Sequence, residues 1–409
     1  MHIRSETYEK AVGNESIRTH RMYTGFGLEM TENRKVETEN DFFSVSQIRH
    51  SQDNGRTWSA YIPDEMNYEK DGEREIVRNI ASVEPNAATG HMVRTVMRRT
   101  FLYNHSEVYG KYWKTGAMDW RDHTFVEISR DCGKTYTAGP MLAYEQDAGI
   151  DFNHGYHGNN ICMAAGGAMY TAISAPVDSV CRAFSKKTED YAQNGAITNA
   201  VIVFRISYDA SSDAYTAEPA EPVIISDAVS SRGLLEPNVV LLRDGTIMLE
   251  CRGSNAVADG WKTRMKKGSP SHRWVSYSGD GRNFSIPSPM LFDDGTAFNS
   301  PSSMSRWLRH SVNGRLYWAG NITEGIPEGN RPRYPLCIAE YNEQERRLAR
   351  ESMGILDDRK PGDGELVQFS NFTYYEDRET HGMHLEYSRL GQNADLTWQG
   401  DAVRATASV

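Results

Sequence analysis

The sequence has no long apolar segment, no closely paired cysteines and no excess of positive charge. A membrane-spanning helix needs about 20 consecutive apolar residues, and no run in this chain approaches that length. The five cysteines are odd in number and form no C-x-x-C pair, which argues against a disulfide framework or a zinc site and predicts free, mostly buried thiols. The net charge of −10 argues against nucleic acid as a partner, but not against a small anion in a local basic pocket.

The chain also lacks a recognisable secretory signal. Its first residues, Met1 to Glu6, are mostly polar, so the chain as given is expected to be cytoplasmic, or secreted if a preceding segment was removed. A composition of 39% hydrophobic residues with 34 glycines and 21 tyrosines is typical of a turn-rich β protein. Its 409 residues could fill two or three average domains, but a single ring of β-sheets also reaches this length. We therefore expect one domain over residues 1–409.

Short internal repeats indicate the fold. The segments 51–58 and 129–136 fit the pattern S-x-D-x-G-x-T-aromatic, and 278–284 is a shortened copy. In such a turn the Asp and Ser side chains bond backbone groups, Gly adopts a positive φ, and the aromatic ring covers the sheet edge. These turns are expected to close hairpins and not to touch a ligand.

A second repeat, out of phase with the first, is expected to mark the innermost strands. Six apolar stretches open with short polar motifs about 60 to 80 residues apart. The openings are Arg21-Met-Tyr, Glu84-Pro-Asn, His157-Gly-Asn, Glu236-Pro-Asn, Asn299-Ser-Pro and Phe369-Ser-Asn. Each interval can hold a four-stranded antiparallel sheet with its loops, which is one propeller blade. The spacing predicts an all-β, six-bladed β-propeller.

The stretch 236–252 places hydrophobic runs on both sides of a turn at Asp244 and Gly245, which predicts a β-hairpin. Because the two strands are antiparallel, Glu236 and Arg252 return to the same edge of the sheet. A carboxylate and a guanidinium then share one rim. Together with the S-x-D-x-G turns, which look like Asp-boxes, and the six openings, this hairpin resembles the sialidase superfamily over essentially the whole chain.

The resemblance implies an acidic sugar as the ligand. Sialidases bind the carboxylate of their sugar with three arginines, because a planar guanidinium matches a carboxylate through two parallel hydrogen bonds. By this resemblance the arginines are Arg252, Arg333 with Arg331 as the alternative, and Arg21 with Arg18 as the alternative. The resemblance also makes Asp41 the proton donor to the leaving group, the alternative being a solvated loop carboxylate.

The sequence differs from the sialidase pattern at the position of the nucleophile. In sialidases a tyrosine activated by a Glu attacks the sugar, and Glu236 matches that Glu. The tyrosine slot falls near Asn371, and the nearest phenols, Tyr374 and Tyr375, come three and four residues later. Either the register is shifted, or the chain does not use a tyrosine. In the second case Glu236 with Asp41 or Glu84 could support direct displacement by water.

The remaining openings supply candidate substrate-binding residues. Five side chains are expected to ring one central cavity, namely Glu84, His157, Glu236, Asn299 and Asn371. The pair His154 and His157 lacks a third metal ligand in sequence, so we expect no metal and no cofactor. A histidine there is expected to hydrogen-bond a sugar or to act as an acid or base.

Three functions remain open. The first is an exo-acting glycoside hydrolase that removes a terminal acidic sugar, sialic acid or a relative, from a glycan. The second is an enzyme of the same fold with other chemistry, such as a uronate-directed hydrolase or lyase, and the third is a propeller that binds glycan without cleaving it. The arginines favour an acidic glycan in all three, and no membrane partner is expected. The retained carboxylates favour an enzyme, and we favour the first function.

Overall fold

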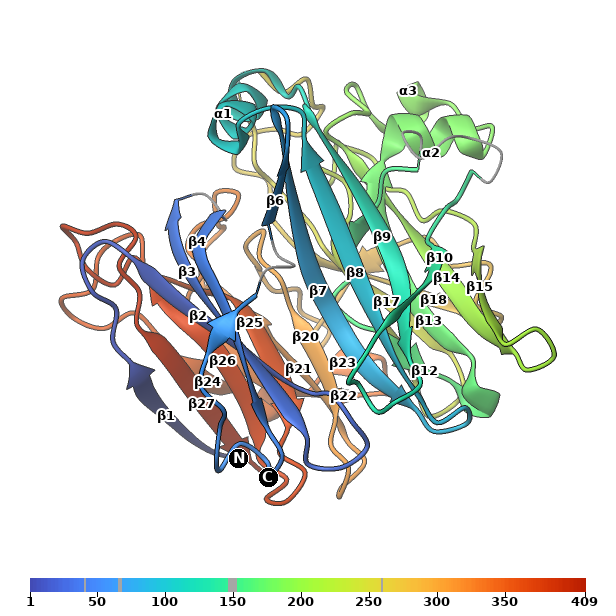
Figure 1. Ribbon diagram of the computed structural model, residues 1–409. Helices are drawn as coiled ribbons and strands as arrows, with labels where there is room; N and C mark the ends of the chain where they lie inside the picture. The colour runs from blue at the N-terminus through green and yellow to red at the C-terminus, as the bar shows by residue number, and fades with distance from the viewer. Residues whose placement is uncertain (40–41, 65–67, 146–152, 259) are drawn as a thin grey trace. The chain divides into compact units, whose positions relative to one another are not determined.

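The computed structural model describes residues 1–39, 42–64, 68–145, 153–258 and 260–409. Backbone contacts divide the chain into two compact units, one formed by Met1–Glu65 with Met290–Val409 and the other by Met66–Pro289. The described residues of each unit form three antiparallel sheets of four or five strands (Figure 1). These six sheets are the blades of a six-bladed β-propeller, which confirms the predicted fold class.

In the first unit, one sheet comprises β2 (Ser16–Tyr23), β3 (Met30–Glu39), β4 (Phe42–Ser51) and β5 (Ile62–Pro63). The next comprises β20 (Arg306–Arg309), β21 (Leu316–Asn321), β22 (Leu336–Asn342) and β23 (Arg347–Leu348), with β24 (Gly354–Asp357) paired to β22. The last comprises β25 (Gln368–Glu376), β26 (Met383–Leu390), β27 (Ala402–Ser408) and β1 (His2–Glu9). Because β1 pairs with β27, the two ends of the sequence complete one blade.

In the second unit, the first sheet comprises β6 (Tyr68–Asp71), β7 (Arg74–Asn86), β8 (His91–Phe101), β9 (Trp120–Ser129) and β10 (Thr137–Met141). The second comprises β11 (Tyr156–His157), β12 (Cys162–Met163), β13 (Met169–Pro176), β14 (Asn199–Asp209) and β15 (Ala214–Pro219). The third comprises β16 (Leu235–Leu241), β17 (Ile247–Arg252), β18 (Arg273–Ser278) and β19 (Ser288–Pro289). The connections carry α1 (His105–Thr115), α2 (Val177–Ala183) and α3 (Thr188–Tyr191).

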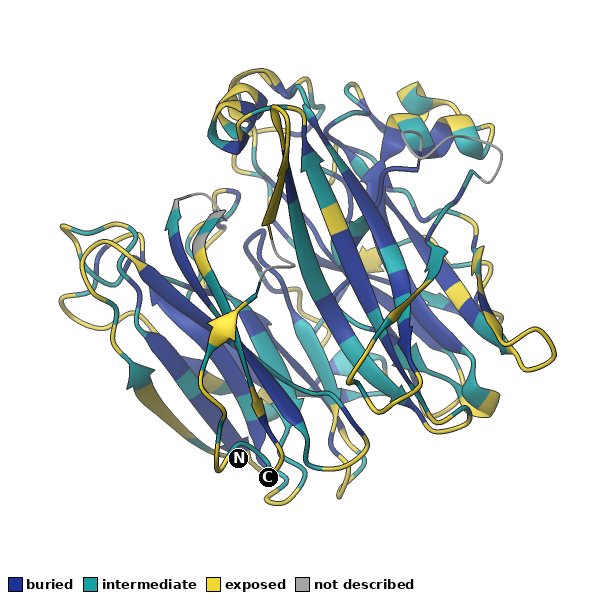
Figure 2. Cartoon of the chain, in the orientation of Figure 1, coloured by how far each residue is buried: buried dark blue, intermediate teal, exposed yellow. Residues whose placement is uncertain are grey.

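Three strands in the middle of their blades are buried along their whole length. Every residue of β13, β17 and β21 is buried (Figure 2). A polar side chain on such a strand must find partners, since an unpaired buried polar group is costly. All five cysteines are free and three of them are buried, as predicted. No helix in the described part of the chain is long and apolar enough to cross a membrane.

The S-x-D-x-G turns form the hydrogen bonds expected from their sequence. Asp53 accepts from the Thr57 amide at 2.8 Å and from its hydroxyl at 2.7 Å, and Asp131 accepts from Thr135 at 2.9 and 2.6 Å in the same way. Asp280 makes the equivalent backbone contacts in the shortened copy. Hydrogen bonds from Thr57 lower the pKa of Asp53 to about 2. These turns organise the outer hairpins of their blades.

Candidate functional site

The hairpin formed by β16 and β17 brings Glu236 and Arg252 together, as the sequence predicts. The pairing shifts between Leu235 and Asn238, so Glu236 lies in a β-bulge with a left-handed φ of 45°. Arg252 Nη1 donates a hydrogen bond to Glu236 Oε1 at 2.5 Å. The other carboxylate oxygen, Oε2, has no hydrogen-bond partner in the part of the chain that the structure describes. A strained backbone that presents a half-satisfied carboxylate is typical of a functional site.

Buried polar groups surround the Glu236–Arg252 pair. Asn159 Nδ2 donates to the backbone oxygen of Glu236 at 2.9 Å. Arg273 lies directly across the ladder from Arg252, is fully buried, and is 3.5 Å from Glu250. Glu250 also accepts from Asn238 Nδ2 at 2.8 Å. The guanidinium groups of this hairpin are therefore balanced by carboxylates.

His157 lies on β11 in the same unit and is hydrogen-bonded through both ring nitrogens. Nδ1 is 2.8 Å from the Gly158 oxygen, so Nδ1 carries the proton, and Nε2 then accepts from Asn79 Nδ2 at 3.2 Å. The ring of Tyr156 stacks on that of His157 with centroids 4.5 Å apart. These contacts hold His157 in a neutral tautomer. In the described residues no group of three or more His, Cys, Asp and Glu side chains is placed to hold a metal ion.

The expectation that Glu84 opens an inner strand is wrong. Strand β7 begins ten residues earlier, at Arg74, and Glu84 lies two residues before the turn in which Gly90 bonds Asn86. The bulge of β7 falls near Ile80, and its neighbour Asn79 is the residue that reaches His157. The Glu-Pro-Asn motif thus repeats in the sequence without repeating its position along the strand. Asn79 was missed because β7 is much longer than β16.

In the first unit, Arg18 belongs to a cluster of polar side chains. The sequence offered Arg18 only as the alternative to Arg21. Arg18 is buried, forms an ion pair with Glu37, and lies 5.6 Å from the centre of the Phe43 ring. With the Asn371 amide in the orientation that its neighbours favour, its oxygen accepts from Arg18 Nη1 at 2.8 Å. His20 Nε2 lies 3.3 Å from the Asn371 backbone oxygen. Arg18, His20 and Asn371 therefore share one location.

Lys35 adds a second cation to this cluster. It lies directly across the ladder from Arg18, is only 6% exposed, and its ammonium is 4.9 Å from the Phe43 ring centre. Within the described ranges it forms no hydrogen bond and no ion pair. Burial lowers the pKa of Lys35 to about 8; the nearby Asp64 carboxylate opposes this shift, and Arg18 adds a smaller lowering. Burial together with Lys35, Arg18 and Arg306 lowers the pKa of His20 to about 3.

Asn371 is the residue near which the resemblance places the tyrosine slot. It has a left-handed φ of 55° in a bulge between Ser370 and Thr373, the same backbone feature that presents Glu236. Tyr374 donates to Met383 Sδ at 3.2 Å, and burial raises its pKa. Tyr375 lies 3.4 Å from Glu386, and its pKa is also raised, first by burial and then by Glu386. A raised pKa is the opposite of what activates a phenol as a nucleophile.

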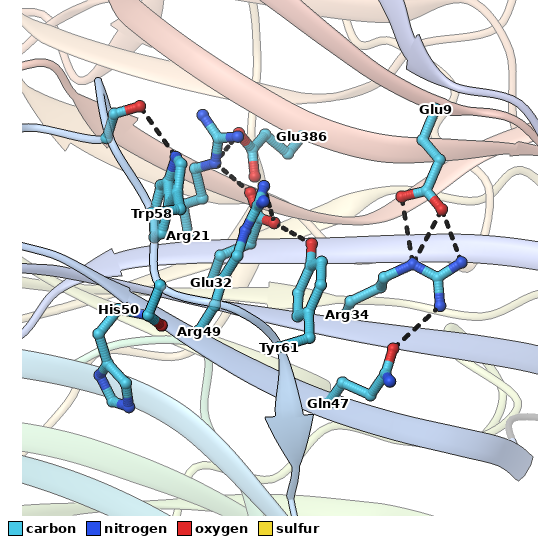
Figure 3. Close-up of polar contacts among 12 residues, drawn as sticks. Glu9, Arg21, Glu32, Arg34, Gln47, Arg49, His50, Trp58, Tyr61 and Glu386 are labelled. Atoms are coloured by element: carbon cyan, nitrogen blue, oxygen red, sulfur yellow. Dashed lines mark hydrogen bonds and ion pairs between the residues drawn. The ribbon is translucent and has the colours of Figure 1, made fainter.

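Arg21, the favoured alternative to Arg18, belongs to a different network (Figure 3). Its Nε donates to Glu32 Oε2 at 2.5 Å and lies 3.3 Å from Glu386. The guanidinium lies over the Trp58 ring at 5.0 Å, and Arg49 forms a further ion pair with Glu32 at 2.6 Å. Arg21 is thus neutralised by protein carboxylates.

The remaining predicted residues make other contacts or lie outside the described residues. Arg333 donates to Gln368 Oε1 at 3.1 Å and to the Ser302 oxygen at 3.0 Å. The backbone oxygen of Asn299 accepts from Thr323 at 2.9 Å. Asp41 lies outside the described residues. The single cavity stays a prediction, because its expected residues are divided between the two units.

Comparison with known proteins supports the fold. No protein-family model and no curated protein matches the sequence. A protein of unknown function from Dyadobacter fermentans DSM 18053 superposes with a TM-score of 0.59, 13% identity and 98% of each chain covered. An intramolecular trans-sialidase from Ruminococcus gnavus in complex with oseltamivir carboxylate gives a TM-score of 0.55 and 9% identity over 95% of this chain and 93% of that one. An α-L-arabinofuranosidase from Fusarium graminearum gives 0.53 and 10% over 96% and 92%. The fold is that of sialidase-like propellers.

Proposed function

We propose that this protein is an exo-acting glycoside hydrolase that removes a terminal acidic sugar, sialic acid or a relative, from a glycan. The observation that carries the proposal is the placement of Arg18 and Lys35 directly opposite each other on β2 and β3. Like charges at such positions destabilise a sheet. A buried ammonium that forms no direct ion pair is also costly, and Asp64 offsets only part of that cost at Lys35. An unfavourable charge arrangement of this kind is explained if a bound anion offsets it, and a sugar carboxylate has the required negative charge.

In this proposal Arg18 takes the place that the resemblance offered to Arg21. The guanidinium of Arg18 and the ammonium of Lys35 bind the carboxylate, and the neutral imidazole of His20 does not compete for it. Asn371 donates through its amide nitrogen, since its oxygen already faces Arg18. The two cations attract the sugar carboxylate, and the hydrogen bond from the Asn371 amide orients it.

Glu236 supplies the acid or base chemistry in this proposal, and Arg252 holds it in position. The Oε1 atom is engaged by Arg252, whereas Oε2 is buried and has no hydrogen-bond partner among the described residues. In this proposal Oε2 exchanges a proton with the glycosidic oxygen, or with a water that enters with the substrate. With Asn371 in the tyrosine slot, the reaction proceeds by direct displacement by water and not through a phenol. Asp41 is proposed as the second carboxyl group.

The first test measures activity on a panel of acidic glycosides, with products identified by mass spectrometry. Arg252→Lys keeps the charge but removes the fixed geometry that holds Glu236, so kcat/KM is expected to fall about ten- to a hundredfold. Arg282→Lys is the control, since Arg282 is an exposed arginine of the same unit, with 69% of its side chain accessible. Full activity of folded Arg252→Lys, or an equal loss in the control, would contradict the role given to Arg252.

A second candidate is a uronate-directed hydrolase or lyase. It is favoured by the same cations and by the contacts of Tyr374 with Met383 and of Tyr375 with Glu386, since neither enzyme needs a phenol nucleophile. The mass of the product separates the candidates. A hydrolase adds one water across the cleaved bond, whereas a lyase forms an unsaturated sugar and adds none. Binding of an acidic glycan without any product would indicate a propeller that only binds.

A further inference from the structure

An aromatic surface lies beside the edge that carries Glu236 and Arg252. Helix α1 is inserted between β8 and β9, and residues 253–272 are inserted between β17 and β18. The two insertions meet where the ring of Trp113 stacks on that of Trp261, with centroids 5.5 Å apart and an interplanar angle of 23°. Figure 1 shows α1 at the end of its blade, where β8 ends and β9 begins. We call Trp113, Trp261, Tyr112 and Arg232 the aromatic platform.

Trp113 is exposed although its surroundings are rigid. All eight tryptophans lie within the described residues, and Trp113 is the only one of them that is exposed, at 48%. Trp261 beneath it is 4% exposed, and Tyr112 packs edge-on against it. Helix α1 is fixed at its start by the Asn104 side chain and at its end by Gly116. One face of the Trp113 ring is therefore covered, and the other remains open to solvent.

Arg232 supplies hydrogen-bond donors at the platform. Its guanidinium lies 5.5 Å from the Trp261 ring centre and 6.0 Å from that of Trp113. One nitrogen, Nη2, donates to the Tyr112 hydroxyl at 3.1 Å. Among the described residues no carboxylate forms an ion pair with Arg232. The aromatic rings orient this cation without neutralising it.

The platform lies on the loops that lead to and from the Glu236–Arg252 edge. Arg232 precedes Glu236 by four residues, and the loop that carries Trp261 begins directly after Arg252. The two loops are joined where the Ser231 amide donates to the Ser254 oxygen at 2.8 Å. Two of the platform residues, Arg232 and Trp261, are therefore carried by loops that adjoin the strands of Glu236 and Arg252.

We propose that the aromatic platform binds the sugar unit adjacent to the one that is cleaved. An open indole ring presents a flat apolar surface to the C–H face of a pyranose, while guanidinium donors bond its hydroxyl oxygens. This combination recognises a pyranose ring and does not require a charge on it. The proposal rests on the proposed function, because it assigns the leaving-group side of the same reaction.

The experiment compares two substrates that carry the same acidic sugar. One is linked to a neutral disaccharide, and the other is the glycosyl fluoride, which has no second sugar. For Trp113→Ala we expect about a three- to tenfold rise in KM on the oligosaccharide, and no change on the fluoride. Trp113→Tyr should recover most of the loss. The control is Phe26→Ala, since Phe26 is an aromatic residue of similar exposure, 44%, in the other unit.

An unchanged KM on the oligosaccharide, or an equal loss on both substrates, would overturn the proposal. If the wild type cleaves neither substrate, the proposed function fails and the platform is tested by binding alone. Tryptophan fluorescence is then followed while lactose is added to the wild type and to Trp113→Ala. A saturable change in the wild type that is absent from the variant would support the platform as a sugar site, and no change in the wild type would overturn it.

Discussion

Strand β2 carries two arginines whose partners across the ladder differ in sign. Arg21 faces Glu32, which in turn faces Arg49 on β4, so opposite charges alternate across three strands. Arg18 faces Lys35, so like charges meet. The arginines are three positions apart on the strand, an odd spacing that places them on opposite faces of the sheet. In the first arrangement every cation forms a direct ion pair, whereas in the second Glu37 pairs with Arg18 and Lys35 has only the attraction of Asp64 to offset its burial.

The Arg21 network shows how completely a protein can neutralise buried charge (Figure 3). Glu32 is fully buried and also accepts from the Tyr61 hydroxyl. Burial raises the pKa of Glu32, but Arg21 and the hydrogen bonds outweigh it and hold the pKa below its usual value. Glu386 shows the opposite result, because burial raises its pKa despite Arg21 and Arg404. Glu32 is therefore the carboxylate that holds Arg21 most firmly.

The largest stability change is expected from Arg21→Ala. Removal of this cation leaves Glu32 and Glu386 buried with fewer partners, which should lower the free energy of unfolding by about 3–5 kcal/mol. Urea denaturation at neutral pH measures it. The control is Arg56→Ala, since the ion pair of Arg56 with Glu379 is largely exposed and should contribute less than about 1 kcal/mol. Equal losses in both variants would show that burial does not distinguish the networks.

A smaller change of opposite sign is expected from Lys35→Met. Removal of a buried cation whose burial outweighs the attraction of Asp64 should raise the free energy of unfolding by about 1–2 kcal/mol at neutral pH. The folded-state pKa of Lys35 is about 8, below the usual value of 10.5, so the unfolded chain binds more protons between these values. Wild-type stability should therefore contain a component that rises with pH from about 8 to 10.5, and the variant should lack it. A destabilised Lys35→Met would mean that Lys35 supports the fold.

The smallest effects are expected from Tyr374→Phe and Tyr375→Phe. Both phenols lie in contacts that do not include Asn371, so each variant should retain kcat/KM within about threefold of the wild type. Glu236→Gln is the positive control and should lose at least about a hundredfold. A loss of about a thousandfold in either tyrosine variant, with a covalent sugar adduct on that tyrosine, would restore the ordinary sialidase mechanism.

The fold and the Glu236–Arg252 contact could be predicted because their signals are local. The Glu236–Arg252 contact needs only a hairpin, and the turn at Asp244 and Gly245 specifies that hairpin within 17 residues. The Asp53 turn is likewise complete within its own segment. A side-chain contact can be predicted from the sequence when both residues lie on one pair of adjacent strands.

The Arg18–Lys35 cluster could not be predicted because it depends on register and on distant segments. The choice between Arg18 and Arg21 depends on Glu386, more than 360 residues away in the sequence, which occupies one face of the β2 sheet. Lys35 could have been found by pairing β2 with β3, but only with the ladder register in hand. The prediction that Glu84 opens a strand failed for the same reason, because a repeated tripeptide does not fix its position along the strand.

The measurement that tests the central claim most directly is the selectivity of Arg18→Met for acidic over neutral sugars. It compares kcat/KM for an acidic glycoside and for the same glycoside with its carboxylate reduced to an alcohol. We expect the wild type to prefer the acidic substrate by about a hundredfold or more, and the variant to lose that preference by its loss on the acidic substrate alone. An equal loss on both substrates, or full retention of the preference, would contradict the assignment of Arg18 and Lys35 to the sugar carboxylate.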